Sequence, residues 1–355
     1  MSFIFTNLPP LKTKYPSFSE VFYSLIPECT ELDIAVGYIT ADSLAELKQI
    51  VAFNDNIKSL NLIIGMHYWD RFTKLEYSAA TLLQDFLMEQ DKGCVSLVTP
   101  FRFHGKMYSF SCGNKPIAGV IGSNNLSSIL DSRNRIYEAS AIYRDEKQAT
   151  DINKFIKQLF RTSTRSLTDC GINENDLKKD MPPLNGIEGV SKFPHEKLVD
   201  VGKTLTNISF ELPFVKKRKG VNPQSDLNCY FGKGRKQKSG LVPARPWYEV
   251  EVMVSTEITR NNDYPQSKVE FDVITHDGWA FKCYVSGGDG QKSLRSVGDL
   301  TILGRWLKGH LENAGVLKVG ELVVEDTLVN YGRTSLVLTK TTTPNLWYLD
   351  FGVNK

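Results

Sequence analysis

The stretch Phe101–Ser128, FRFHGKMYSFSCGNKPIAGVIGSNNLSS, contains the features that decide the fold of the first half of the chain. Two apolar runs flank the turn-forming tetrapeptide Gly-Asn-Lys-Pro, which predicts two strands joined in a hairpin. His104 and Lys106 are two positions apart, so they point to the same side of the first strand. Asn125 follows the second strand, and the hairpin is therefore expected to bring it near both of them.

These side chains fit the chemistry of a phosphodiester. A neutral imidazole at His104 can attack phosphorus and form a covalent phosphohistidine. Lys106, Asn125 and the hydroxyl of Ser123 can stabilise the negative charge of the transition state without a metal ion. Glu138, on a following strand, can bond the other ring nitrogen of His104 and fix its tautomer. Two alternatives stay open, a turn role for Ser123 and a solvent-facing edge strand for Glu138.

The same mechanism needs a second histidine as general acid for the leaving group. This prediction takes His104-Gly-Lys106 as the one His-x-Lys motif that the chain supplies. The other histidines are His67, His195, His276 and His310. One chain is therefore expected to supply half of a site, and two chains are expected to form a homodimer with the site on its axis. No metal ligands are predicted.

Strand and helix signals alternate on both sides of this hairpin. The apolar runs Leu32–Tyr38 and Leu60–Met66 predict buried strands, and Ala41–Phe53 and Ala79–Met88 have the periodicity of amphipathic helices. This alternation predicts an α/β domain over residues 1–165. Residues 166–190 are polar and read as a linker. Residues 191–355 contain many short strand signals and one clear helix, which predicts a mainly β domain, barrel-like or open.

The second half also carries a basic segment, 216–247, with nine lysines and arginines and a single acidic residue, Asp226. Such a segment can follow DNA phosphates, while its arginine and amide side chains reach base edges. A glycine-rich stretch, 287–295, is a second candidate arm. The alternative without DNA contact is that 216–247 is an ordinary solvated basic loop and that 287–295 is a glycine hairpin. The candidate DNA contacts are Asn228, Arg235, Lys236, Arg245, Trp247, Asp277, Gln291, Lys292 and Arg295.

Size and composition set broader limits. A chain of 355 residues is long enough for two domains, and its net charge of +3 is close to balance. The six cysteines form no CxxC pair, so we expect reduced thiols. The N-terminus lacks the apolar core of a signal peptide, and no apolar run approaches the ~20 residues of a membrane span. A bacterial cytoplasmic location is the default expectation, with no membrane partner.

The motif His104-Gly-Lys106 followed by Gly122-Ser-Asn-Asn125 resembles the signature of the phospholipase D superfamily. That signature usually has an aspartate a few residues after the lysine, where this chain reads MYSFSC. Aspartate is dispensable in many nuclease members, so the difference argues against a lipase more than against a nuclease.

The resemblance extends to the restriction endonucleases of the NgoFVII and NgoAVII group. It rests on ELDIAVGYITADSLAEL and LNLIIGMHYWD, and on Ser225–Asn228, Gly232–Arg235, Thr275–Gly278, Leu303–Trp306 and Tyr331–Arg333. It implies a phospholipase-D-like nuclease domain and a B3-like DNA-binding pseudobarrel. It also implies metal-independent cleavage of double-stranded DNA by a homodimer in a restriction-modification system, as a type II-like enzyme. Some members act with a separate ATPase or helicase subunit that uses ATP.

The sequence is compatible with three functions. The first is a sequence-specific endonuclease. The second is a phospholipase or other phosphodiesterase on substrates that are not nucleic acid, which predicts two His-Lys motifs or an apolar membrane-facing surface. The third is a non-catalytic DNA-binding protein with a degenerate enzyme domain, which predicts loss of His104, Lys106 or Asn125. The basic segment and the intact constellation favour the first.

Overall fold

The computed structural model describes residues 1–130, 136–216, 219–287 and 292–353. By its internal contacts the chain divides into two units. Unit 1 comprises Met1–Asp180 and Lys233–Ala244, and unit 2 comprises Met181–Gly232 and Arg245–Lys355. The border after Asp180 falls within the linker expected at 166–190. The segment 233–244, which the sequence assigned to the second domain, is grouped with unit 1.

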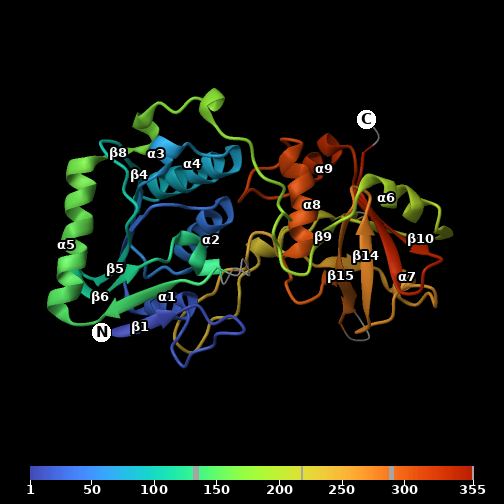
Figure 1. Ribbon diagram of the computed structural model, residues 1–355, viewed down its shortest axis with the longest axis horizontal. Helices are drawn as coiled ribbons and strands as arrows, with labels where there is room; N and C mark the ends of the chain where they lie inside the picture. The colour runs from blue at the N-terminus through green and yellow to red at the C-terminus, as the bar shows by residue number, and fades with distance from the viewer. Residues whose placement is uncertain (131–135, 217–218, 288–291, 354–355) are drawn as a thin grey trace. The chain divides into compact units, whose positions relative to one another are not determined.

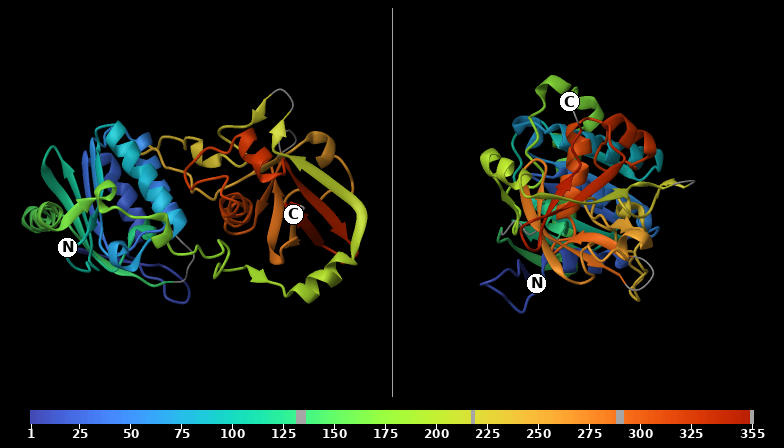
Figure 2. Two further views of the ribbon diagram at one scale, coloured as in Figure 1. Left: turned by 90° about the horizontal axis from the view of Figure 1, so that it is seen from above. Right: turned by 90° about the vertical axis from the view of Figure 1, so that its right-hand side faces the viewer.

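Unit 1 contains an 8-stranded sheet with helices on both faces (Figures 1 and 2). The strand order is β1-β7-β6-β5-β2-β3-β4-β8, in which β2, β3 and β4 run parallel and β5, β6 and β7 pair antiparallel. Helix α5 (Glu146–Ser163) covers one face, and α1 (Phe18–Leu25), α2 (Ala41–Phe53) and α4 (Lys74–Glu89) lie on the other. The strands are β1 Ser2–Phe5, β2 Glu31–Val36, β3 Ser59–Ile64, β4 Gly93–Val98, β5 Lys106–Cys112, β6 Lys115–Gly122, β7 Ala139–Tyr143 and β8 Thr164–Ser166.

Local sequence explains why these elements begin where they do. Helix α2 starts with a capping box, in which the Thr40 side chain accepts from the Ser43 backbone and the Ser43 side chain accepts from Thr40. Helix α4 starts in the same way with Thr73 and Glu76. The central strands read as continuous apolar runs because helices cover both of their faces.

The backbone of the segment before β5 passes very close to the carboxyl ends of β2 and β3. Gly65 donates from its backbone nitrogen to Val36 O at 2.8 Å, and Phe103 donates in turn to Gly65 O at 3.1 Å. A Cβ atom at Gly65 would overlap the carbonyl oxygen of Phe103. A Cβ at Gly37 would lie 3.1 Å from Cδ2 of His104. The two glycines therefore let the chain carry His104 over the carboxyl ends of the parallel strands.

We expect Gly65→Ala to destabilise unit 1 by roughly 3 kcal/mol, because the added methyl group overlaps backbone atoms that cannot rotate away. Thermal unfolding followed by circular dichroism measures this loss as a lower melting temperature. Gly202→Ala is the matched control, since nothing lies within 4 Å of a Cβ at Gly202. Equal melting temperatures for Gly65→Ala and the wild type would contradict the close crossing.

Unit 2 contains a second 8-stranded sheet (Figure 1). Its strands follow the order β10-β17-β18-β14-β15-β16-β13, and β9 pairs with β15. Strands β14 and β18 are parallel, whereas β14–β15, β15–β16 and β17–β18 are antiparallel. The strands are β9 Ser191–Lys192, β10 Leu205–Pro213, β13 Val252–Val254, β14 Glu270–Thr275, β15 Trp279–Ser286, β16 Lys292–Ser296, β17 Ser335–Thr341 and β18 Leu346–Asp350. A separate pair joins β11 (Val215–Lys216) to β12 (Gly220–Val221).

The helices of unit 2 are α6 (His195–Gly202), α7 (Thr256–Thr259), α8 (Ile302–Asn313) and α9 (Glu325–Tyr331). Helix α8 corresponds to the one clear helix predicted within 191–355, and its apolar face, which includes Trp306, is buried. Among the described residues, no helix combines the length and apolar character that crossing a membrane requires. The six cysteines are all free thiols.

The core of unit 2 is organised around Trp247, which is 0% exposed. Its indole nitrogen donates to Glu312 at 2.8 Å, and Lys308 Nζ lies 3.7 Å from the centre of its ring. Lys308 also donates to Trp247 O at 2.5 Å. Burial lowers the pKa of Lys308 to about 7, against the opposing charge of Glu312. The sequence predicted that Trp247 contacts DNA. Because its side chain is fully enclosed, Trp247 belongs instead to the core of unit 2.

Candidate active site and DNA-contacting residues

His104 and Lys106 stand together at the start of β5. His104 is exposed, whereas the side chain of Lys106 is buried. Lys106 Nζ lies 3.1 Å from Nδ1 and 3.0 Å from Nε2 of His104, and it donates to His104 O at 2.7 Å. An ammonium equally close to both ring nitrogens lies over the face of the ring, because an in-plane position would overlap the carbon between them. The ammonium therefore occupies one face of the ring, while His104 as a whole is exposed to solvent.

Burial lowers the pKa of Lys106 below its ordinary value, while the negative charge of Glu138 opposes that shift. The charge of Glu138 also adds to the effect of burial in raising the pKa of Tyr108. The cation of the site is thus partly desolvated, and one carboxylate helps to keep it charged. A cation shielded from water in this way acts more strongly on a nearby phosphate than an exposed lysine does.

Glu138 is held by its backbone. Its nitrogen donates to Thr6 Oγ1 at 3.0 Å, and Thr6 N donates to its carbonyl oxygen at 3.0 Å. The side chain, with Asn124, lines a hollow of about 300 Å³. In the described parts of the chain, its carboxylate acts on Lys106 through charge, and no hydrogen bond joins it to His104. Its role in orienting the imidazole stays a prediction.

Tyr38 contacts both Asn125 and His104 and so links the two residues. The sequence did not predict a role for Tyr38 in the site. The backbone nitrogen of Tyr38 donates to Asn125 Oδ1 at 3.1 Å, so the amide nitrogen of Asn125 is the end that can donate to a phosphate. The ring centre of Tyr38 lies 5.6 Å from that of His104, in an edge-on arrangement. The Gly-Tyr pair that ends the LDIAVGY run was the available signal, because it places an aromatic ring at a strand end.

The Tyr38 ring is itself fixed by an ionic cluster. Its hydroxyl donates to Asp70 Oδ2 at 2.7 Å, and Arg102 Nη2 lies 3.5 Å from Asp70 Oδ1. The hydrogen bond from Tyr38 lowers the pKa of Asp70, and the same bond raises the pKa of Tyr38. The Arg102 guanidinium also lies over the ring of Trp69, 5.5 Å from its centre. Tyr38 is therefore a positioning residue for both His104 and Asn125.

We expect Tyr38→Ala to slow DNA cleavage by about 10²-fold, because His104 loses the ring that limits its orientation. Tyr38→Phe keeps the ring and should recover most of the rate. Single-turnover cleavage rates, with DNA affinity measured in parallel, test this. If Tyr38→Phe cleaved as slowly as Tyr38→Ala, the hydroxyl of Tyr38 and not its ring would be the group that positions His104.

Ser123 and Asn124 serve the fold in this arrangement. Ser123 Oγ accepts from Ala139 N at 2.9 Å and lies 3.2 Å from Ala139 O, so the hydroxyl links β6 to β7. Asn124 is buried, its carbonyl oxygen accepts from the Tyr108 hydroxyl at 2.9 Å, and its Oδ1 accepts from Ser140 at 2.5 Å. The turn interpretation of Ser123 agrees with this geometry. Phosphate contact by Ser123 would require these bonds to rearrange.

Unit 1 contains one further imidazole besides His104. His67 is 4% exposed, and its Nε2 lies 3.6 Å from Glu76. The Tyr38 ring lies 5.6 Å from the ring centre of His67, as it does from that of His104. His67 is therefore enclosed, whereas His104 is exposed.

The half-site prediction counted a single His-x-Lys motif, and this count is wrong, because His195 and Lys197 have the same spacing. His195 is the first residue of helix α6. Residues two apart on a helix do not share a face, so this pair does not reproduce the arrangement of His104 and Lys106.

Asn228 was expected to contact DNA, but it is 0% exposed. Its amide nitrogen donates to Asn222 O and to Val323 O, both at 2.8 Å, and its Oδ1 accepts from Val323 N at 2.9 Å. All of these bonds join separate parts of the unit 2 backbone. The expectation is therefore corrected to a structural role, as it is for Trp247.

Arg235 and Lys236 are exposed and lie in 233–244, the part of the basic segment that belongs to unit 1. This part is a compact loop. Asn54, at the end of α2, donates to Val242 O at 3.1 Å and accepts from Val242 N at 3.0 Å. Leu241 is buried at 4% exposure. Both basic side chains thus remain candidates for phosphate contact, presented by an anchored loop.

Other expected DNA contacts are engaged in ion pairs or lie on strands. Arg245 pairs with Glu249 at 3.4 Å, and Arg295 pairs with Glu251. Lys292 opens β16, in register with Val254 of β13. Gln291 lies outside the described residues. Contacts of these arginines with DNA would compete with their carboxylate partners.

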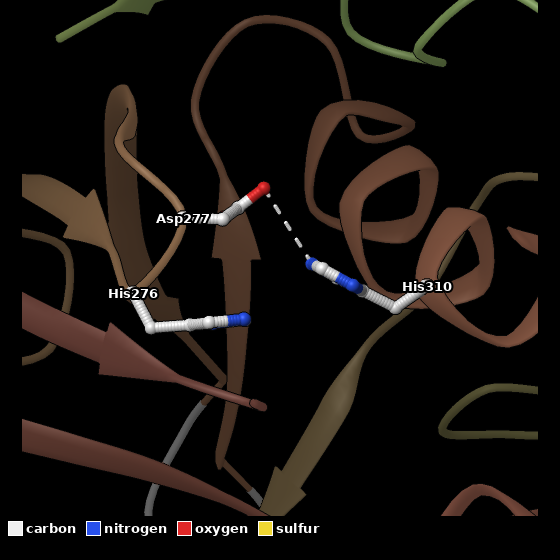
Figure 3. A group of neighbouring side chains, drawn as sticks. All are labelled: His276, Asp277 and His310. Carbon is white, nitrogen blue, oxygen red and sulfur yellow. Dashed lines mark ion pairs between the residues drawn. The ribbon is translucent and has the colours of Figure 1, made fainter. Parts of the chain in front are cut away.

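Asp277 lies in the turn between β14 and β15 (Figure 3). Several donors surround its carboxylate. Oδ1 accepts from Thr275 Oγ1 at 2.7 Å and from Trp306 Nε1 at 2.8 Å. Oδ2 lies 3.7 Å from His310 Nε2 and 3.7 Å from Lys192 Nζ. A carboxylate with so many partners is poorly suited to accept from a cytosine amino group, the role expected from the sequence.

Comparison with known proteins identifies both halves of the chain. The profile of the NgoFVII restriction endonuclease N-terminal PLD domain matches residues 17–176, and the profile of the NgoFVII C-terminal B3-like DNA-binding domain matches residues 200–342. These matches confirm the predicted fold class, a phospholipase-D-like α/β domain followed by a mainly β, B3-like pseudobarrel. A comparison with curated proteins gives no match.

Three solved structures resemble parts of the chain. Nuc from Salmonella typhimurium, a phospholipase D family member, is 14% identical, with 46% of this chain and 97% of that chain covered and a TM-score of 0.31. NucT from Helicobacter pylori is 15% identical, with 46% and 97% covered and a TM-score of 0.32. Phosphatidylserine synthase from Haemophilus influenzae Rd KW20 is 16% identical, with 48% and 41% covered and a TM-score of 0.32.

Proposed function

The chain belongs to the NgoFVII family of restriction endonucleases, and from this premise we propose that it is a site-specific deoxyribonuclease acting through a covalent phosphohistidine at His104. The observation that carries the proposal is the contact between the exposed His104 ring and the buried Lys106 ammonium. It supports an exposed nucleophile and a cation fixed beside it.

In the first step, a ring nitrogen of His104 attacks phosphorus, and a P–N bond forms as a P–O bond of the DNA strand breaks. Lys106 and the Asn125 amide stabilise the charge on the non-bridging oxygens. The leaving oxygen takes a proton from an imidazolium. In the second step, water loses a proton to that same imidazole and attacks phosphorus, which breaks the P–N bond and frees His104.

We assign the imidazolium to His104 of a second copy of the chain, so that a homodimer shares one site. The exposure of His104 and the enclosure of His67 support this assignment. The chemistry uses nitrogen, ammonium and amide groups throughout, and we propose that cleavage needs no metal ion. The B3-like unit supplies the sequence specificity, and any ATP is used by a separate subunit.

Cleavage of plasmid DNA by the purified full chain in excess chelator tests the metal-independent mechanism. We expect discrete fragments whose ends map to one sequence. Cleavage that appears only after magnesium is added would overturn the phosphohistidine mechanism, and randomly placed cuts would overturn the site-specific function.

The shared site is tested with mixed dimers that carry one wild-type and one His104→Ala subunit. They should be inactive, whereas half of the wild-type rate would mean independent sites.

A further inference from the structure

We infer that His276, Asp277 and His310 bind one zinc ion within unit 2. One donor atom from each residue can be chosen so that all three lie within 4.8 Å of one another. Two of the residues come from the turn between β14 and β15, and His310 comes from α8 (Figure 3). Two imidazoles and a carboxylate are a donor set that zinc takes readily in proteins. His276 and Asp277 are adjacent, but His310 lies far from them in the chain, so the three residues form no local sequence motif.

The carboxylate of Asp277 is already oriented for this role. Thr275 and Trp306 donate to Oδ1 at 2.7 Å and 2.8 Å. Oδ2 is the oxygen that faces His310, with Nε2 3.7 Å away. Zinc-binding carboxylates are commonly held by such outer hydrogen bonds, which leave one oxygen for the metal. Asp277 would therefore bind through Oδ2.

His276 is fixed from its far side. Phe351 N lies 3.3 Å from Nδ1, and Asp350 Oδ1 lies 3.7 Å from the same nitrogen. When Nε2 binds a metal, Nδ1 carries the proton and donates to a carboxylate such as that of Asp350. A Cβ at position 352 would lie 2.8 Å from Cδ2 of His276, so glycine leaves room for the ring. The Asp350 bond would replace the Phe351 bond on metal binding.

Small movements would complete the site. Zn–N distances of about 2.0–2.1 Å place tetrahedral ligands roughly 3.3 Å apart, so the widest pair must close by at most roughly 1.5 Å. The pocket beside Asp277 and His310, of about 530 Å³, can supply water as the fourth ligand. Lys192 is the competitor, because its Nζ lies 3.7 Å from Asp277 Oδ2 and donates to Asp277 O at 2.6 Å. The zinc ion would displace this ammonium and tie the β14–β15 turn to α8.

Zinc titration of the full chain tests the inference without reference to cleavage. After chelator treatment and dialysis, calorimetry with zinc chloride should show one ion per chain with a Kd below about 10 µM. Cobalt should give the intense visible bands of a tetrahedral complex. His310→Ala and Asp277→Asn should each weaken binding at least about 10-fold. His195→Ala should bind as the wild type does, and Lys192→Ala should bind at least as tightly.

Thermal unfolding gives the second readout. Zinc binding to the folded state should raise the melting temperature of the wild type by several degrees, and this rise should disappear in His310→Ala. The Asp277→Asn variant keeps an oxygen for Trp306, so it separates loss of a ligand from loss of folding. Absence of zinc binding to the wild type would overturn the inference. So would equal zinc affinity in the wild type, His310→Ala and Asp277→Asn.

Discussion

Replacement of His104 by alanine is expected to reduce the single-turnover rate of DNA cleavage by about 10⁴-fold or more, because the nucleophile itself is lost. DNA affinity should change little, since His104 is one exposed side chain in the nuclease unit and the B3-like unit supplies the recognition. Rates are measured with enzyme in excess over DNA, so that product release does not limit them.

His195→Ala is the matched control, because it removes another exposed histidine, one that lies on α6. This variant should cleave at the wild-type rate. Residual cleavage by His104→Ala at more than about one hundredth of the wild-type rate would indicate a different nucleophile. A large loss of DNA affinity in His104→Ala would instead assign the residue to binding.

Lys106→Met should lower the same rate by about 10³-fold, since it removes a preorganised cation from the charged transition state. Burial lowers the pKa of Lys106, so its ammonium is lost as the pH rises through a value below the ordinary 10.5. The wild-type rate should therefore fall on the alkaline side earlier than an exposed lysine would allow. Lys106→Arg should be slow as well, but without this alkaline fall, because guanidinium stays protonated.

Lys115→Met is the control for lost charge, because Lys115 is exposed and pairs with Glu146 at 3.3 Å. It should leave the rate unchanged. If the cleavage rate of Lys106→Arg fell at high pH as the wild-type rate does, a group other than Lys106 would be responsible for the fall. A Lys106→Met variant with full activity would remove Lys106 from the site.

Much of the first unit could be predicted, because strong periodicity and local chemistry agree there. The runs around LDIAVGY and LNLIIGM became β2 and β3, and the hairpin around Gly-Asn-Lys-Pro became β5 and β6. His104 and Lys106 also lie together, although His104 precedes the first residue of β5 by two positions and the contact is made by the Lys106 side chain reaching back to the ring and carbonyl oxygen of His104. The fold class of both units also followed from the resemblance to a family.

Other features depend on contacts that no local pattern contains. The basic segment looked uniform in sequence, yet Trp247 and Asn228 within it are buried while Arg235 is exposed. Burial of Trp247 depends on Lys308 and Glu312 of α8, which the chain reaches only much later. The Tyr38 contact with Asn125 likewise joins β2 to the end of β6. Such pairings become visible only when the whole sheet is assembled.

Cleavage is proposed to proceed through a covalent bond between His104 and phosphorus. The stereochemistry at phosphorus tests it most directly, with a chiral phosphorothioate at the cut position and cleavage in isotopically labelled water. Two successive in-line displacements, first by His104 and then by water, predict overall retention of configuration. Inversion of configuration would show a single direct attack by water and would contradict the phosphohistidine mechanism.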